Sequence, residues 1–190
     1  MARPRSEDKR QAILQAATRL FAEEGLNAPT ARIAKAAGVA EGTLFTYFAS
    51  KDELMNRLYL ELKGGLRAEM APAPPVQAGL REQLRHAWHT YVRWGAAHPD
   101  LRQVLAQLGL SDRVSEATRA EGMQAFCDVA LLLQTAMAQG GLRRQPPAFA
   151  AALMGAMAEA TMDFLAREPA QADSTSEAGF TAFWNALTQG

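Results

Sequence analysis

The chain has 190 residues, of which 48% are apolar, and its 20 Lys and Arg side chains balance its 20 Asp and Glu side chains. This apolar content is enough for a buried core, and the alanine-rich composition with few β-branched runs favours helices over strands. A single cysteine, Cys127, excludes an intramolecular disulfide and a cysteine-rich metal site.

The first periodic segment starts at Ser6, which can cap a helix, and stops at Gly25, which can end one. Apolar side chains recur along it at helical spacing, namely Ile13, Ala16, Ala17, Leu20 and Phe21. The pattern predicts an amphipathic helix with one buried face.

A second and a third helix are predicted around a tight turn at Gly38. Thr30 is the expected N-cap of the second helix, and the third runs from Glu41 to Phe48. Gly38 can take a positive φ, and Ala34 is small enough for the two helices to cross closely. Such a helix-turn-helix places its second helix in the major groove of DNA.

The rest of the chain is also predicted to be helical. Ser50 and Glu53 indicate a capping box, at which a fourth helix begins, and the proline-rich segment 70–75 breaks the pattern after it. Further helices are expected at about 77–96, 100–108, 113–139, 146–167 and 174–188. No long alternating pattern of a strand occurs, so the predicted fold class is all-α.

Charge is distributed unevenly along the chain. Residues 1–51 contain eight Lys and Arg against five Asp and Glu, whereas the remainder carries an equal excess of negative charge. A local positive excess is what binding to phosphate groups requires, although many solvated surfaces carry as much.

Three segments, Thr30-Ala-Arg-Ile-Ala-Lys-Ala-Ala-Gly-Val, Glu41-Gly-Thr-Leu-Phe-Thr-Tyr-Phe and Ser50-Lys-Asp-Glu-Leu, resemble the tetracycline-repressor (TetR) family of transcriptional regulators. The resemblance covers about residues 6–55 and implies a helix-turn-helix DNA-binding domain at 1–50, followed by an effector-binding and dimerisation domain at 51–190. It also implies that Leu44 and Phe48 face inward, as part of the core. The residues that it implies at the DNA are Thr30, Arg32, Glu41, Gly42, Thr43, Phe45, Thr46, Tyr47 and Lys51. Two other interpretations stay open, a solvated carboxylate at Glu41 and a helical hairpin without a ligand.

Three positions depart from the pattern that is common in this family. Ala40 stands where Ser or Thr often caps the third helix, Phe45 stands where Tyr is usual, and Ala31 replaces a longer polar side chain. Few direct base contacts remain, so we expect specificity to depend on dimer spacing and DNA shape.

The body is expected to form a homodimer, because one head makes few phosphate contacts and half-sites lie about 34 Å apart or a multiple of it. The resemblance implies that the last two helices form the interface. The predicted interface residues are Phe149, Leu153, Ala156, Ala160, Phe164, Phe180, Phe183, Trp184 and Leu187. The alternative is that both apolar stripes face the core of their own chain.

The helices from about 77 to 139 are expected to enclose a pocket for a small apolar or aromatic effector. Its predicted lining is Trp88, Tyr91, Trp94, Met123, Phe126 and Met157. An aromatic or methionine stripe at helical spacing is also typical of plain core, and this alternative stays open for each residue.

His86 and His89 stand three residues apart, which is the spacing of a metal-binding pair. No acidic residue stands beside them, and the sequence has no Gly-rich phosphate loop, nucleophile elbow or HExxH motif. We therefore expect no enzyme, no cofactor and no metal, with a metal-dependent enzyme at this pair as the alternative.

Together these patterns predict a ligand-responsive repressor that binds a palindromic DNA operator as a homodimer. A regulator controlled by a protein partner is the other possibility. The sequence shows no signal peptide after Met1 and no apolar run long enough to span a bilayer, so we expect a soluble cytoplasmic protein.

Overall fold

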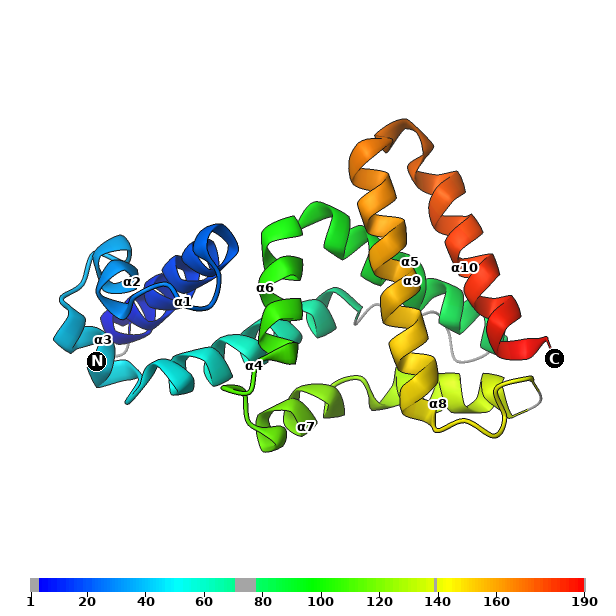
Figure 1. The fold of residues 1–190 in the computed structure, drawn as a ribbon, viewed down its shortest axis with the longest axis horizontal. Helices are drawn as coiled ribbons and strands as arrows, with labels where there is room; N and C mark the ends of the chain where they lie inside the picture. The colour runs from blue at the N-terminus through cyan, green and yellow to red at the C-terminus, as the bar shows by residue number, and fades with distance from the viewer. Residues whose placement is uncertain (1–3, 71–77, 139, 190) are drawn as a thin grey trace. The chain divides into compact units, whose positions relative to one another are not determined.

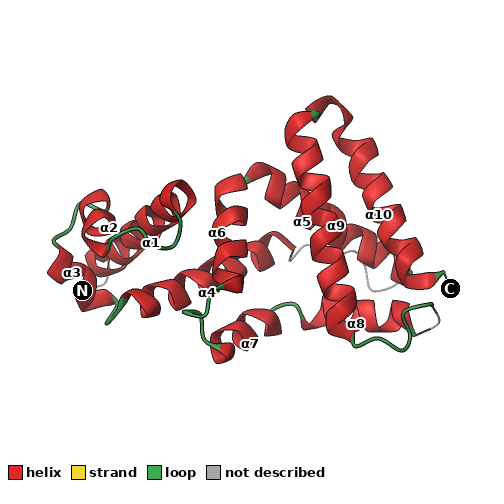
Figure 2. Ribbon diagram, viewed as in Figure 1, coloured by secondary structure: helices red, strands yellow, loops and turns green. Residues whose placement is uncertain are grey.

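The computed structural model describes residues 4–70, 78–138 and 140–189, and within these ranges every regular element is helical (Figures 1 and 2). The N-terminal helices are α1 (Pro4–Glu24), α2 (Thr30–Ala36), α3 (Glu41–Tyr47) and α4 (Lys51–Met70). They are followed by α5 (Leu80–Ala97), α6 (Pro99–Leu110), α7 (Glu116–Gln124) and α8 (Cys127–Met137). The last elements are α9 (Pro147–Arg167), a 3-10 turn (Pro169–Gln171) and α10 (Ala172–Thr188). The all-α prediction is confirmed.

The structure corrects the predicted start of the first helix and the predicted continuity of a later one. Helix α1 begins at Pro4, so Ser6 lies inside the helix instead of capping it. The stretch 113–139 forms two helices, α7 and α8, and the predicted single helix is wrong. No Pro or Gly marks this break, which falls at residues 125–126. Most of the proline-rich segment 70–75 lies outside the described residues.

The chain forms two compact units. Unit 1 comprises Met1–Gly64 and His98–Met123, and unit 2 comprises Gly65–Ala97 and Gln124–Gly190. Helix α6 belongs to unit 1 because it packs on α1, where the Gln103 side-chain amide donates to the carbonyl oxygen of Ala22 at 3.1 Å. The units therefore do not coincide with a boundary between residues 50 and 51.

The core of unit 1 joins α1 to the two short helices after it. Ile13, Phe21, Ile33 and Leu44 are all completely buried. Such burial stabilises a folded chain by about 1.5–3 kcal/mol for each large apolar side chain. This core fixes α2 and α3 on α1, although each short helix has only 7 residues and would be unstable alone.

The core of unit 2 is built around Trp88 of α5. Its ring is completely buried and stacks on Phe183 of α10 with 5.6 Å between ring centroids. The indole Nε1 donates to the carbonyl oxygen of Ser176 at 3.0 Å. Gly179 allows this close approach, because a Cβ there would lie 2.9 Å from the Trp88 ring and 2.6 Å from Oγ1 of Thr161. Helices α5, α9 and α10 are thus locked together.

Helix α9 is long and apolar enough, by length and composition alone, to cross a membrane. From the sequence we expected no such run. One helix of this kind is weak support for a membrane protein, because the core helix of a globular protein passes the same test. In unit 2 the side chains of Ala150, Ala158 and Met162 on α9 are buried in the core.

Candidate nucleic-acid interface

The turn between α2 and α3 has the geometry of a helix-turn-helix. Gly38 has a φ of +69°, and the amide of Val39 donates to the carbonyl oxygen of Ala34 at 3.0 Å. Ala34 is 1% exposed at the crossing of the two helices. The roles predicted for Gly38 and Ala34 are confirmed.

Helix α3 has two chemically distinct faces. Leu44 and Phe48 are buried, as predicted, and α3 packs on α2. On the other side Phe45 is 41% exposed, Thr46 is also exposed, and Tyr47 is half-buried. Gly42 is exposed and Thr43 is half-buried in the first turn of α3. The helix therefore presents an apolar ring and hydroxyl groups on a surface that its own core leaves free.

Thr30 and Glu41 connect the starts of the two short helices. The Thr30 hydroxyl donates to Oε1 of Glu41 at 2.7 Å. Thr30 is therefore not the N-cap of α2, and that prediction is wrong: Pro29 holds the N-cap position because its φ of −66° and ψ of 142° are extended. Glu41 accepts from Thr30, so its carboxylate is more than a solvated group of the first turn.

Arg32 and Lys51 are the two cations that were predicted at the DNA. Nη1 of Arg32 lies 2.6 Å from Oε2 of Glu24, and the Arg32 side chain remains 59% exposed. Glu24 was not singled out in the sequence, because it lies in the preceding helix and only the fold brings it to Arg32.

Lys51 is placed by the start of α4. The amide of Glu53 donates to Oγ of Ser50 at 3.0 Å, and the amide of Ala49 donates to Oε2 of Glu53 at 2.7 Å. These bonds confirm the predicted capping box. The Lys51 ammonium lies 5.8 Å from the centre of the Phe21 ring. Burial, and then the charge of Arg113, lower the pKa of Lys51 below its usual value, while Asp52 acts in the opposite direction.

The six residues predicted to line an effector pocket lie in different surroundings. Trp88 is core. Tyr91 stacks on Trp94 with 6.4 Å between ring centroids and donates to Glu159 at 3.3 Å. Trp94 is 6% exposed, Phe126 is 9% exposed and Met157 packs against the core of unit 2. Met123 belongs to unit 1 and is 46% exposed.

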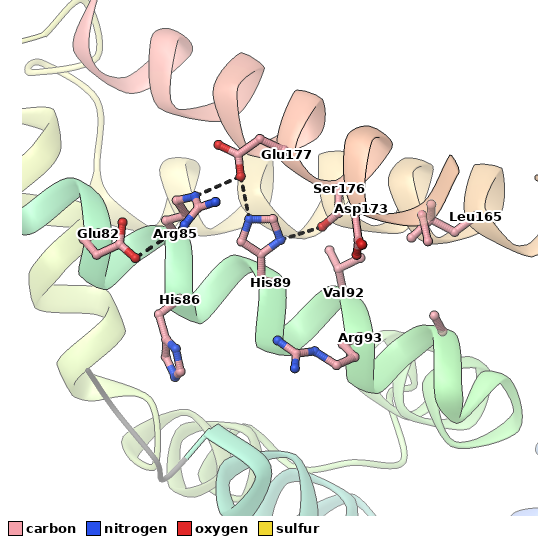
Figure 3. Close-up of a pocket in the computed structure, with 12 residues that line it drawn as sticks. Glu82, Arg85, His86, His89, Val92, Arg93, Leu165, Asp173, Ser176 and Glu177 are labelled. Carbon is pink, nitrogen blue, oxygen red and sulfur yellow. Dashed lines mark hydrogen bonds and ion pairs between the residues drawn. The ribbon is translucent and has the colours of Figure 1, made fainter. Parts of the chain in front are cut away.

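Unit 2 instead contains a cleft of about 620 Å³ between α5 and α10 that is lined by charged side chains (Figure 3). Arg85 donates to Glu177 at 2.8 Å on one side of it. Val92 and Leu165 supply apolar surface. Within the part of the chain that the structure describes, Arg93 has no ion-pair partner. None of the six predicted residues lines this cleft, because periodicity alone does not separate core from lining.

His86 and His89 point in different directions although they share α5 (Figure 3). His89 lies between two residues of α10, with Nδ1 2.8 Å from Oγ of Ser176 and Nε2 2.9 Å from Oε2 of Glu177. Nε2 of His86 is buried and has no hydrogen-bond partner among the described residues. The described ranges also contain no group of three or more His, Cys, Asp or Glu that could hold a metal ion.

The predicted dimer interface separates into an exposed and a buried set. On α9, Phe149 and Phe164 are each 43% exposed, Ala156 and Ala160 are exposed, and Leu153 is half-buried.

On α10 the prediction is wrong for Phe180, Phe183 and Leu187, which are all 0% exposed in the single chain. They fill the core under Trp88 and have no surface to offer a second copy. Trp184 is half-buried and packs on the same core.

Residues 13–58 match the family model described as bacterial regulatory proteins, tetR family. A curated relative, an uncharacterised HTH-type transcriptional regulator of Bacillus subtilis, is 33% identical over 82 residues, which are 40% of this chain and 43% of the relative. The match thus spans less than half of that relative. These comparisons cover the segment that contains the helix-turn-helix.

The solved structures extend the likeness to the whole chain. A tetR family transcription regulator from Shewanella sp. PV-4 has a TM-score of 0.83 and 28% identity, over 94% of this chain and 97% of the other. The regulator FadR of Bacillus subtilis, solved in complex with stearoyl-CoA, has a TM-score of 0.67 over 93% of this chain and 98% of the other. At 19% identity that second likeness concerns the fold alone. The named relatives are transcriptional regulators and not enzymes.

Proposed function

Because the chain belongs to the tetR family of bacterial regulatory proteins, we propose that it is a transcriptional repressor that binds a palindromic DNA operator as a homodimer. The observation that carries the proposal is the arrangement of α3, whose inner face is buried while Phe45 and Thr46 face outward. A helix held in this way can enter the major groove without exposing its core. The protein would work in the cytoplasm, where its DNA is.

The exposed residues suit DNA in two ways. Phe45 offers apolar contact to a thymine methyl group, and the hydroxyls of Thr43 and Tyr47 can donate to phosphate oxygens. Lys51 supplies a cation at the start of α4, and Arg32 supplies another once it exchanges Glu24 for a phosphate. Most of these contacts hold the backbone, so we propose that dimer spacing and DNA shape contribute much of the specificity.

The test of this function is selection of bound duplexes from a random pool by the purified full chain. We expect enrichment of a palindrome whose half-sites are separated by about 34 Å or a multiple of it. Enrichment of single half-sites would overturn the homodimer, and no enrichment at all would overturn DNA binding.

The proposed dimer forms through α9. Its stripe of Phe149, Leu153, Ala156, Ala160 and Phe164 places two half-exposed aromatic rings at the ends of a row of apolar residues, which is unusual for a surface that stays in water. Ala156→Glu would bury a charge in this interface. We expect the variant to sediment as a monomer, whereas Ala166→Glu, at an exposed position nearer the end of the same helix, leaves the dimer intact.

We propose that the cleft of unit 2 binds the effector that releases the operator. The sequence predicted an apolar or aromatic effector, but the charged lining favours a ligand with an acidic or hydrogen-bonding group as well. Arg93 can bind an acid and Nε2 of His86 can take a hydrogen bond, while Val92 and Leu165 contact an apolar part. The stearoyl-CoA complex of FadR is consistent with a ligand in this fold.

Native mass spectrometry of the purified chain tests the effector. A copurified small molecule that releases the selected duplex would support the proposal, and Arg93→Ala should weaken its binding without changing operator affinity in its absence. A copurified protein that controls release would replace the small-molecule effector by a partner.

A further inference from the structure

Arg113 reaches the N-terminus of α4 from the loop between α6 and α7. Its Nη1 donates to Oδ1 of Asp52 at 2.9 Å, although the two residues are 61 positions apart. Both side chains remain about half exposed, 50% for Arg113 and 56% for Asp52. Asp52 directly follows Lys51, so an acidic and two basic groups meet at the start of this helix.

The loop is held in place by bonds that do not involve the Arg113 side chain. The Asn56 amide nitrogen donates to the carbonyl oxygen of Arg113 at 2.8 Å, and the amide of Ser115 donates to Oδ1 of Asn56 at 3.0 Å. The side chain of Val114, between them, is completely buried. Arg119 adds a hydrogen bond to the carbonyl oxygen of Val114 at 2.6 Å. Position 113 is therefore fixed beside α4 whatever its side chain.

Burial has the largest effect on the Lys51 ammonium and lowers its pKa. The charge of Arg113 lowers this pKa as well, whereas the charge of Asp52 raises it. Without Arg113, the carboxylate of Asp52 would cancel the charge of Lys51 toward an approaching phosphate. With Arg113 the three groups sum to one positive charge. The effect on an incoming anion extends over about 10 Å at 0.1 M salt, which includes the first phosphate that Lys51 can reach.

We propose that Arg113 is a charge-compensating residue of the DNA interface: it neutralises Asp52, so that the Lys51 end of α4 stays attractive to phosphate. This inference depends on the proposed function. It assigns to a loop of the second half of the chain an electrostatic part in DNA binding, and it does not need Arg113 to contact DNA.

The test is a set of charge variants of the full chain, measured on the duplex that the wild type selects. Arg113→Ala should weaken binding by about three- to tenfold, and Asp52→Asn should strengthen it by a similar factor. The double variant Asp52→Asn/Arg113→Ala restores the net charge, so it should bind within about twofold of the wild type with an unchanged salt dependence.

The double variant also distinguishes charge compensation from structural damage and from a direct phosphate contact. A loss of binding through damaged structure would not be rescued by Asp52→Asn. If Arg113 contacted a phosphate itself, the double variant would bind weakly and its salt slope would fall by about 0.9 for each contact. Either result would overturn the inference.

Arg144→Ala is the control for total charge, because it removes one exposed arginine of unit 2. It should leave affinity within about twofold, because the unit that contains Arg144 does not include the helix-turn-helix. If the wild type binds the duplex and Arg113→Ala binds it with the same affinity, the inference is overturned and the proposed function still stands. A wild type that binds no duplex would overturn the function itself.

Discussion

The helix-turn-helix of unit 1 and the α5–α9–α10 core of unit 2 use aromatic side chains in opposite ways. In the helix-turn-helix, α3 buries Leu44 and Phe48 and leaves Phe45 41% exposed. In unit 2 the aromatic residues Trp88, Phe180 and Phe183 are all completely buried, and charged side chains line the cleft instead. Exposed apolar surface thus marks the proposed contact with DNA in one unit, whereas charged side chains form much of the cleft lining in the other.

This difference shows in which unit a short sequence motif is enough to predict the functional residues. The helix-turn-helix is a local structure, so the inward and outward positions of α3 follow from a few neighbouring residues. The cleft of unit 2 is formed by helices far apart in the chain. Which aromatic residues of unit 2 belong to its core depends on contacts between those helices, such as the one between Trp88 and Phe183.

Removal of Trp88 should have the largest effect and would show whether it is core. Trp88→Ala should lower the free energy of unfolding by about 3–5 kcal/mol, because it leaves a cavity against Phe183 and removes the hydrogen bond from the indole to the carbonyl oxygen of Ser176. Urea denaturation measures the loss, with Trp184→Ala, at a half-buried ring, as the milder control. A loss below about 1 kcal/mol would show that Trp88 lines an open space instead.

A smaller effect is expected in the turn of the helix-turn-helix. Gly38→Ala should lower the free energy of unfolding by about 1–2 kcal/mol, because φ is +69° at this position. A Cβ at Gly38 meets no described atom within 4 Å, so the loss is conformational and not steric. Gly42→Ala is the matched control, since its Cβ also has room and its helical φ suits alanine. Equal stabilities for the two variants would contradict the assigned turn geometry.

The smallest effect concerns the ion pairs across the cleft. Burial raises the pKa of Glu177, but hydrogen bonds and charges from His89 and Arg85 outweigh it and hold the pKa below its usual value of 4.5. A lowered native pKa stabilises the fold above the unfolded pKa, and this stabilisation is lost as the pH falls through the native value.

Urea denaturation of the wild type and Glu177→Gln from pH 6 to pH 3 measures this contribution. We expect the wild type to lose more stability than the variant on acidification, whereas Glu69→Gln, at an exposed carboxylate of the same unit, should follow the wild type. Parallel curves for wild type and Glu177→Gln would show that the bonds to His89 and Arg85 add no stability.

Much of unit 1 could be predicted from the sequence, because capping boxes, glycine turns and amphipathic spacing act within a few residues. The capping box at Ser50 and the turn at Gly38 were found in this way. The N-cap of α2 was not predicted correctly, because the Thr30 hydroxyl donates to Glu41, which the fold places beside it.

Contacts between distant segments could not be predicted. Arg113 reaches Asp52 across 61 positions, and nothing in the local pattern of either residue indicates the other. The break between α7 and α8 has no Pro or Gly to mark it. The roles of the α10 aromatics were missed for the same reason, because a stripe at helical spacing looks alike whether it faces the core of its own chain or a partner.

The salt dependence of binding to the selected duplex tests the central claim most directly. For the wild type, log K should fall linearly with log [salt]. Lys51→Ala should weaken binding and reduce the slope by about 0.9 for each phosphate that is no longer neutralised, or about 1.8 for a dimer. Such a result would place Lys51 at the DNA backbone. A Lys51→Ala variant with the slope of the wild type would contradict the assignment of this surface to DNA.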